Sequence, residues 1–254
     1  MASVSAPDGT EIAYKQAGNG PPIVLVHGGG TGRSLWNHLR PQLVADGTVI
    51  APDRRGHGDS GDADQYSLDR EVADVRAVVD AVEGDPVLFG HSFGGLCSLE
   101  AARDVPIERL ILYEPALLVG DHRRNDDLAG EMTALIEAGK RRQAIELYFR
   151  EAVGADDADQ PPIDSALLDH AEIIIRQNRA VENYRLDDDL DVSVPTLLLM
   201  SEHGPEHLRD GVRTLHDTLS DSRLVELEGM GHAGISSAPE RVAREIRSFV
   251  SRSY

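Results

Sequence analysis

The pentapeptide GHSFG at residues 90–94 has the strongest reactive pattern in the chain. It follows an apolar run at 87–89 and precedes a helix-forming stretch. A sharp turn from a strand into a helix exposes a serine hydroxyl to base and substrate, and the flanking glycines leave room for its strained backbone. The helix N-terminus adds partial positive charge where an oxyanion would form. The pattern predicts that Ser92 is a nucleophile rather than only a helix cap.

A glycine-rich loop, Gly28-Gly29-Gly30, comes after the first strongly apolar run and directly follows His27. Acyl transfer needs a second backbone N–H directed at the oxyanion, besides that of the residue after the nucleophile. We therefore expect Gly29 and Phe93 to donate these N–H groups and His27 to be a structural hydrogen-bonding residue. A phosphate-binding loop is disfavoured, since GGGTGRS matches neither common glycine-rich phosphate motif.

The candidate general base is His232, which ends the tetrapeptide GMGH after the last apolar run. A neutral imidazole near pH 7 can accept the serine proton and return it to a leaving group. Its loop would lie at the same sheet edge as Ser92, and the chain order of serine before histidine suits this arrangement. The main competitor is His57 in DRRGHGDS, where the surrounding glycines indicate a tight turn.

The elements that must position these groups alternate between strands and helices. Short apolar runs bounded by Gly, Pro or Asp predict buried strands at 23–26, 49–51, 87–89, 110–113, 196–200 and 224–227. Apolar residues at helical spacing predict helices at 68–82, 211–219 and 239–250. Between about 117 and 191 the strand signal disappears, and we expect helices at 124–138, 141–153 and 163–179. This order predicts a parallel α/β sheet with a helical insert at its ligand-binding end.

The motifs HGGG, DRRGHGDS, GHSFG and GMGH, in this order and spacing, resemble those of the α/β-hydrolase superfamily. The resemblance is strongest to its cofactor-free esterase, lipase and C–C hydrolase branch. It implies a mostly parallel sheet of the eight-stranded type, flanked by helices. It also implies a first core part at 1–117, a helical cap insert at 118–190 and a second core part at 191–254. The implied serine mechanism needs no cofactor and no metal.

The chain departs from this family at the third member of the triad. The family usually supplies an Asp in a G-x-x-D turn after the strand matching 196–200, but here that turn reads SEHGP, with Gly204 at the acid position. A carboxylate is still needed to fix the histidine tautomer and stabilise the imidazolium. Some members of the family take it from the end of the preceding core strand, where this chain has Glu114. We expect Glu114 to be the acid, with Glu202, Glu206 or no effective acid as alternatives.

The charge balance excludes several classes of partner. The chain has 44 Asp and Glu against 25 Lys and Arg, a net charge of −19, with Lys15 and Lys140 as its only lysines. Such a charge argues against nucleic acid and against anionic membranes. We expect a halophilic source, since an acidic, lysine-poor surface suits concentrated salt. We also expect a cytoplasmic location, because no secretory signal and no membrane-spanning run is visible. The lone Cys97 should be a buried core thiol.

The predicted reaction is hydrolysis of a small carboxylic ester or lactone through an acyl-enzyme on Ser92. C–C bond hydrolysis and perhydrolysis remain open with the same residues, and a non-catalytic ligand-binding protein is the alternative from another class. Epoxide hydrolases and dehalogenases of this family use an Asp nucleophile, so Ser92 disfavours both. Nothing in the sequence indicates a zinc site, and the acidic run LDDDLD is expected to be a solvated linker. Tyr148 could line an acyl pocket, although packing of the insert is the favoured role.

Overall fold

A sheet of eight strands forms the centre of this computed structural model, which describes residues 1–123, 127–155, 162–187 and 190–251. The strand order is β1-β2-β4-β3-β5-β6-β7-β8. Strands β3 to β8 are parallel, while β2 pairs antiparallel with both β1 and β4. The strands are β1 (Ala2–Ser5), β2 (Glu11–Ala17), β3 (Pro22–Val26), β4 (Thr48–Pro52), β5 (Val87–His91), β6 (Arg109–Tyr113), β7 (Thr196–Ser201) and β8 (Ser222–Leu227).

Every residue of β5, β6 and β7 is buried, because helices cover both faces of the sheet. All six predicted strands lie within β3 to β8, so the expected α/β fold class is confirmed. The hairpin of β1 and β2 was not predicted. The burial of β2 does not alternate regularly, and this removes the period-two signal of a half-buried strand.

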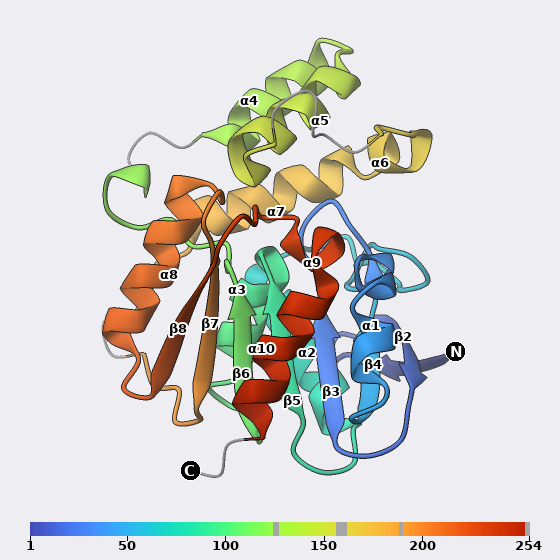
Figure 1. Cartoon of the computed structure of the whole chain (residues 1–254). Coiled ribbons are helices and arrows are strands. Elements are labelled where there is room, and N and C mark those ends of the chain that lie inside the picture. Colours follow the sequence, from blue (N-terminus) through green and yellow to red (C-terminus); the bar gives the residue numbers. More distant parts are fainter. Residues whose placement is uncertain (124–126, 156–161, 188–189, 252–254) are drawn as a thin grey trace.

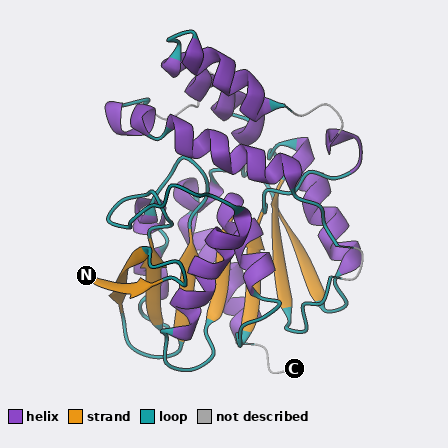
Figure 2. Cartoon of the chain, turned by 180° about the vertical axis from the view of Figure 1, so that it is seen from behind, coloured by secondary structure: helices purple, strands orange, loops and turns teal. Residues whose placement is uncertain are grey.

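The two faces of the sheet have separate cores. One core packs against α2, α3 and α8 and includes Cys97, which is fully buried as expected. The other packs against η1, α1, α9 and α10, with Trp36 and Phe249 among its largest side chains. Figures 1 and 2 show these helices on opposite sides of the sheet. They are η1 (Arg33–Asn37), α1 (Arg40–Leu43), α2 (Leu68–Asp80), α3 (Phe93–Ala101), α8 (Glu206–Thr218), α9 (Gly234–Ser237) and α10 (Pro239–Val250).

A layer of helices lies over the end of the sheet (Figure 1). It has its own apolar cluster, which includes Met132, Ile145 and Ile174. Its elements are η2 (Gly120–Arg123), α4 (Leu128–Glu137), α5 (Arg141–Tyr148), the short π-helix η3 (Phe149–Val153), α6 (Ser165–Asp169) and α7 (Ala171–Asn183). Within the described part of 117–191 no strand occurs, as expected. The division into core and cap at 1–117, 118–190 and 191–254 stays a prediction.

The helix boundaries differ from the predicted ones where apolar spacing is a weak guide. The predicted helix at 124–138 starts at Leu128 in the structure, and 124–126 lie outside the described residues. The helix expected at 163–179 is divided at His170 into α6 and α7. Helix α8 begins at Glu206, earlier than the predicted 211. Its first turn is largely polar, so the apolar spacing did not reveal where the helix starts. No helix among the described residues is long and apolar enough to cross a membrane.

Candidate active site

Ser92 lies at the turn between β5 and α3. Its backbone has φ 54° and ψ −122°, a strained conformation for a residue with a side chain. Close packing explains the glycines around it: a Cβ on Gly94 would collide with the carbonyl oxygens of Val26 and His27. The hydroxyl of Ser92 makes no hydrogen bond within the described residues, and it faces a cavity. The turn therefore presents a free hydroxyl, as the GHSFG motif predicts.

Glu114 and His232 form a buried hydrogen-bonded pair. Nδ1 of His232 lies 2.7 Å from Oε2 of Glu114, whose side chain is completely buried at the end of β6. The other carboxylate oxygen, Oε1, accepts hydrogen bonds from the backbone N–H of Ser201, at 2.8 Å, and from the Ser201 hydroxyl. Because a carboxylate accepts, Nδ1 of His232 carries a proton and Nε2 is left as an acceptor.

The alternative acids lie elsewhere. Glu202 and Glu206 are exposed, and Oε2 of Glu202 accepts the backbone N–H of Gly229 at 2.7 Å. Gly204, at the position where the family usually has its acid, lies directly against Glu114, so that a Cβ there would collide with the Glu114 carboxylate. Of the three candidate carboxylates, the structure brings Glu114 alone to His232.

The loop that carries His232 is held in place by two buried side chains, one of which, His91, directly precedes Ser92. The ring of His91 stacks on that of His232 with centroids 4.6 Å apart, and its Nε2 donates to the His232 carbonyl at 3.1 Å. The hydroxyl of Tyr113 donates to the carbonyl of Gly231 at 2.9 Å. Burial, and then the nearby His232, lower the pKa of His91 well below its usual value, so His91 stays neutral. The residue before the serine thus helps to position the histidine.

The glycine loop that follows β3 packs against the serine turn. A Cβ on Gly28 would lie 3.1 Å from Cβ of Ser92. Phe93 is the first residue of α3, so its N–H has no carbonyl partner within the helix. His27 is fully buried, and its Nε2 accepts the backbone N–H of Arg54 at 3.0 Å, which agrees with the structural role expected for it. Gly29 lines the same cavity as Ser92 and Phe93.

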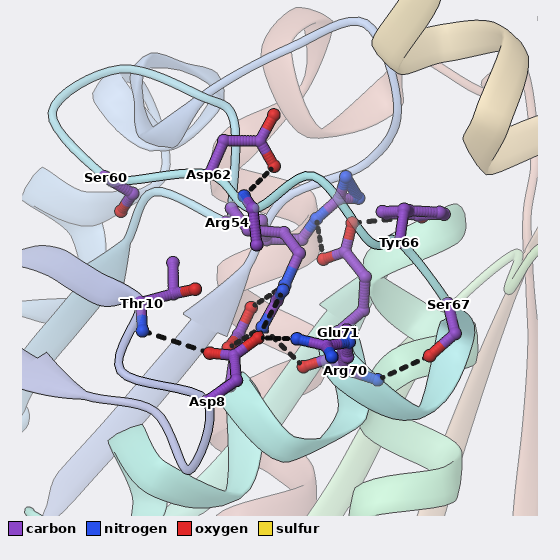
Figure 3. A network of polar contacts seen from close by, with 12 residues as sticks. Asp8, Thr10, Arg54, Ser60, Asp62, Tyr66, Ser67, Arg70 and Glu71 are labelled. Carbon is purple, nitrogen blue, oxygen red and sulfur yellow. Dashed lines mark hydrogen bonds and ion pairs between the residues drawn. The ribbon is translucent and has the colours of Figure 1, made fainter.

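The DRRGHGDS turn packs against the residue that follows Ser92. The guanidinium of Arg54 lies 4.7 Å from the ring centroid of Phe93 and pairs with the buried carboxylate of Glu71 at 3.5 Å. Its neighbour Arg55 bonds Asp74 at 2.6 Å and Asp8 at 3.0 Å. Figure 3 shows Arg54 beside Glu71 of α2, in a network that also joins Arg70 of α2 to Asp8 between β1 and β2. This turn is therefore a buried structural element beside the nucleophile.

His57, the competing base, is directed toward the helical layer. Its Nε2 lies 3.0 Å from Nε2 of Gln177 on α7, and its ring lies 5.2 Å from that of His170. Burial, followed by the positive charge of nearby groups, lowers the pKa of His57 well below its usual value. The buried carboxylate of Glu114 bonds His232 instead.

A cavity of about 530 Å³ opens above Ser92, between the sheet and the helical layer. Its walls include Gly29 and Phe93 on one side and Tyr148 and Gln177 on the other. Four carboxylates and two imidazoles also line it: Asp121, Asp127, Glu131, Glu151, His122 and His207. No Lys or Arg is among the described residues of its wall. The cavity wall thus combines apolar side chains, such as Leu117 and Leu128, with acidic ones.

Comparison with known proteins identifies the family. Residues 23–245 match the model of the Alpha/beta hydrolase family. The chain belongs to this family. The predicted superfamily is therefore confirmed.

Several relatives of this hydrolase align over nearly their whole length. Pyrrolizixenacetamide deacetylase of Xenorhabdus hominickii is 35% identical, and the alignment covers 94% of each chain. The Non-heme chloroperoxidase of Streptomyces lividans is 27% identical over 98% of this chain and 99% of its own. The crystal structure of an alpha/beta hydrolase from Sphaerobacter thermophilus DSM 20745 superposes with a TM-score of 0.83 at 32% identity, covering 98% of this chain and 100% of the other. These relatives differ in activity, so the family establishes a hydrolase without fixing its substrate.

Two residues of the helical layer, Tyr148 and Gln177, line the cavity of this hydrolase. Tyr148 both packs within the helical layer and lines the cavity, whereas packing was the favoured expectation. Gln177 was missed, although it is a polar residue on the buried face of α7 with Ala171 and Ile174. Within the described ranges no cluster of three His, Cys, Asp or Glu side chains could hold a metal ion. The acidic run LDDDLD includes 188–189, which lie outside those ranges.

Proposed function

We propose that this chain is a serine hydrolase that cleaves small carboxylic esters or lactones through an acyl-enzyme on Ser92. The observation that carries the proposal is the buried pair of Glu114 and His232, joined at 2.7 Å beside the strained serine turn. A histidine whose Nδ1–H is bonded to a carboxylate presents Nε2 as a base. A structural ion pair alone would not require a free serine hydroxyl at a cavity next to it.

In the acylation step, Nε2 of His232 removes the proton of Ser92 as Oγ bonds to the carbonyl carbon. The carbonyl oxygen becomes an oxyanion, which the N–H groups of Gly29 and Phe93 would bind. The tetrahedral intermediate then collapses, the bond to the alcohol oxygen breaks, and His232 gives its proton to that oxygen. The partial positive charge at the start of α3 lies on the side of Phe93 and favours the oxyanion.

In the deacylation step, His232 removes a proton from water as the water oxygen attacks the acyl carbon. The second tetrahedral intermediate collapses to the free acid, and the proton returns to Ser92. Glu114 remains ionised throughout, holds the tautomer of His232 and stabilises the imidazolium. The two hydrogen bonds from Ser201 to its other oxygen hold the carboxylate in position.

The cavity supports substrates of modest size that carry no negative charge. Its volume of about 530 Å³ suits a small organic molecule. Carboxylates on its wall would repel an anionic substrate and leave neutral and cationic ones unaffected or favoured. We also propose that 118–190 is a cap that shapes this cavity, since α5 and α7 supply part of its wall.

Two further activities rest on relatives. A relative at 35% identity is named a deacetylase, which supports amide hydrolysis by the same acyl-enzyme. A relative at 27% identity is named a chloroperoxidase, which keeps perhydrolysis as an alternative in which peroxide replaces water. C–C bond hydrolysis has no such support beyond the shared fold.

The test combines labelling with turnover. A fluorophosphonate probe should label the wild-type chain and leave Ser92→Ala unlabelled, and p-nitrophenyl esters of increasing acyl length should be hydrolysed by the wild type alone. An unlabelled wild type with no turnover would instead favour the ligand-binding protein. Turnover that survives in Ser92→Ala would contradict the proposed nucleophile.

A further inference from the structure

Two polar side chains from the helical layer, Gln177 and Tyr148, each bring an oxygen close to Gly29. Gln177 is 2% exposed, and its Oε1 has no hydrogen-bond partner. This oxygen lies 3.2 Å from the place a Cβ of Gly29 would take, and the hydroxyl of Tyr148 lies 2.8 Å from the same place. Both residues line the cavity above Ser92. A buried acceptor without a donor is costly, so its presence at a cavity indicates a group that enters the cavity to bond it.

The orientation of the Gln177 amide follows from its neighbours. Nη2 of Arg54 lies 3.4 Å from Nε2 of His57, and a guanidinium can only donate. His57 is kept neutral by the burial that lowers its pKa, so this Nε2 is its acceptor nitrogen. Nε2 of Gln177 lies 3.0 Å from the same atom, and because an amide nitrogen only donates, it shares this lone pair with Arg54. Oε1 is therefore the atom left without a donor, on a side chain that lines the cavity.

Tyr148 supplies the complementary donor. Burial raises the pKa of its hydroxyl to about 12, so the hydroxyl keeps its proton at neutral pH. The pair offers one acceptor, Oε1 of Gln177, and one donor, the O–H of Tyr148. An amide N–H would bond Gln177 alone and leave Tyr148 unpaired. A substrate hydroxyl can donate to the first and accept from the second at the same time.

We propose that Gln177 and Tyr148 bind a hydroxyl group on the carbon next to the scissile carbonyl, so that the preferred substrates are esters of 2-hydroxy acids. The inference rests on the proposed acyl-enzyme chemistry at Ser92 and deepens it. Gly29 is the expected donor to the carbonyl oxygen, and a hydroxyl one carbon away lies within reach of side chains that contact Gly29. Hydrolysis would consume one water and release the 2-hydroxy acid and the alcohol.

The test compares three methyl esters of nearly equal size by pH-stat titration. Methyl lactate carries the hydroxyl, methyl 2-methoxypropanoate can only accept, and methyl propanoate lacks the oxygen. The wild type should show a kcat/KM for methyl lactate that is at least about tenfold above both others, as expected for one or two hydrogen bonds to a buried site. Equal values for the three esters would overturn the inference and leave the serine hydrolase proposal standing. Failure to hydrolyse any of them, with no fluorophosphonate labelling, would overturn both.

Variants assign the preference to the two side chains. Gln177→Leu should reduce the ratio of kcat/KM between methyl lactate and methyl propanoate to about one, and Tyr148→Phe should reduce it about tenfold. The ratio separates recognition from a general loss of activity, and Tyr148→Phe keeps the test valid if Gln177→Leu does not fold. Gln143→Leu, the same change at an exposed position of α5, should keep the wild-type ratio. An unchanged ratio in Tyr148→Phe or in folded Gln177→Leu would contradict the assignment.

Discussion

The carboxylate of Glu114 fills the space that a side chain on Gly204 would need. The two positions lie at the ends of adjacent parallel strands, β6 and β7, and both face the loop of His232. A carboxylate at 114 therefore leaves no room for a second one at 204. The glycine at the family's usual acid position is explained by this contact and need not mean a lost acid.

Glu114→Gln should lower kcat for a p-nitrophenyl ester by about 10³–10⁴-fold, because an amide in place of the carboxylate no longer fixes the tautomer of His232. Glu202→Gln is the matched control, since its carboxylate is exposed and bonds a backbone N–H. It should keep turnover within about threefold. Near-normal turnover by Glu114→Gln would remove this residue from the mechanism.

Because a side chain at 204 would occupy the space of the Glu114 carboxylate, we expect that an acid at 204 can replace one at 114. Glu114→Ala should lose most activity, and adding Gly204→Asp to it should restore at least about tenfold of kcat by supplying a carboxylate from β7. Gly204→Asp alone should be less active than the wild type, because two carboxylates compete for one space. A double variant no better than Glu114→Ala would show that the two positions are not interchangeable.

Gly94→Ala should destabilise the protein by about 3 kcal/mol, because the new Cβ collides with backbone oxygens at Val26 and His27. Urea unfolding measures the change. Gly61→Ala is the control, since a Cβ there meets its neighbours at 3.5 Å or more. Equal stability of the two variants would indicate that the serine turn can shift to admit a side chain.

The lowered pKa of His207 predicts that the free energy of unfolding depends on pH in the acidic range. Burial, followed by the charges of His232 and His122, lowers its pKa to about 4 from 6.5. The unfolded chain then binds a proton that the folded chain does not, so the free energy of unfolding should fall between pH 6.5 and 4. His207→Gln should lessen this fall by at most about 3 kcal/mol. Urea unfolding at pH 7 and pH 4.5 measures it, with the exposed His216→Gln on the same helix as a control.

The net charge of −19 predicts that salt stabilises the fold, as the proposed halophilic source requires. Raising KCl from 0.05 to 2 M should raise Tm by several degrees, since screening weakens repulsion between surface carboxylates. Activity toward a p-nitrophenyl ester should be retained at the higher concentration. A decline of both Tm and activity in molar KCl would contradict a halophilic source.

The sequence predicts features whose signals are local. Ser92 and the six predicted strands, of which β8 is half-buried and not buried as expected, depend on a few neighbouring residues, because a strand followed by a tight glycine turn has a recognisable pattern. Glu114 was expected from its position at the end of a strand, and the structure brings it to His232. This contact joins the segments that follow β6 and β8, which lie on either side of β7 in the sheet.

The rest depends on how the helical layer packs, which periodicity does not specify. Tyr148 and Gln177 are brought to Gly29 by the relative placement of α5 and α7. The orientation of Gln177 depends further on Arg54 and His57, which belong to another part of the chain. A polar residue on the apolar face of α7 was the available signal, but it indicates burial and not a partner.

The chain leaves the sheet after β6 and returns to it as β7, the immediate neighbour of β6. The stretch between Glu114 and β7 can therefore change in length or sequence without altering a single strand pairing. The reacting groups lie just after strands of the sheet, while most of the cavity wall belongs to the segment between β6 and β7. New specificities can thus be acquired by exchanging one continuous stretch of sequence, while the chemistry is inherited unchanged.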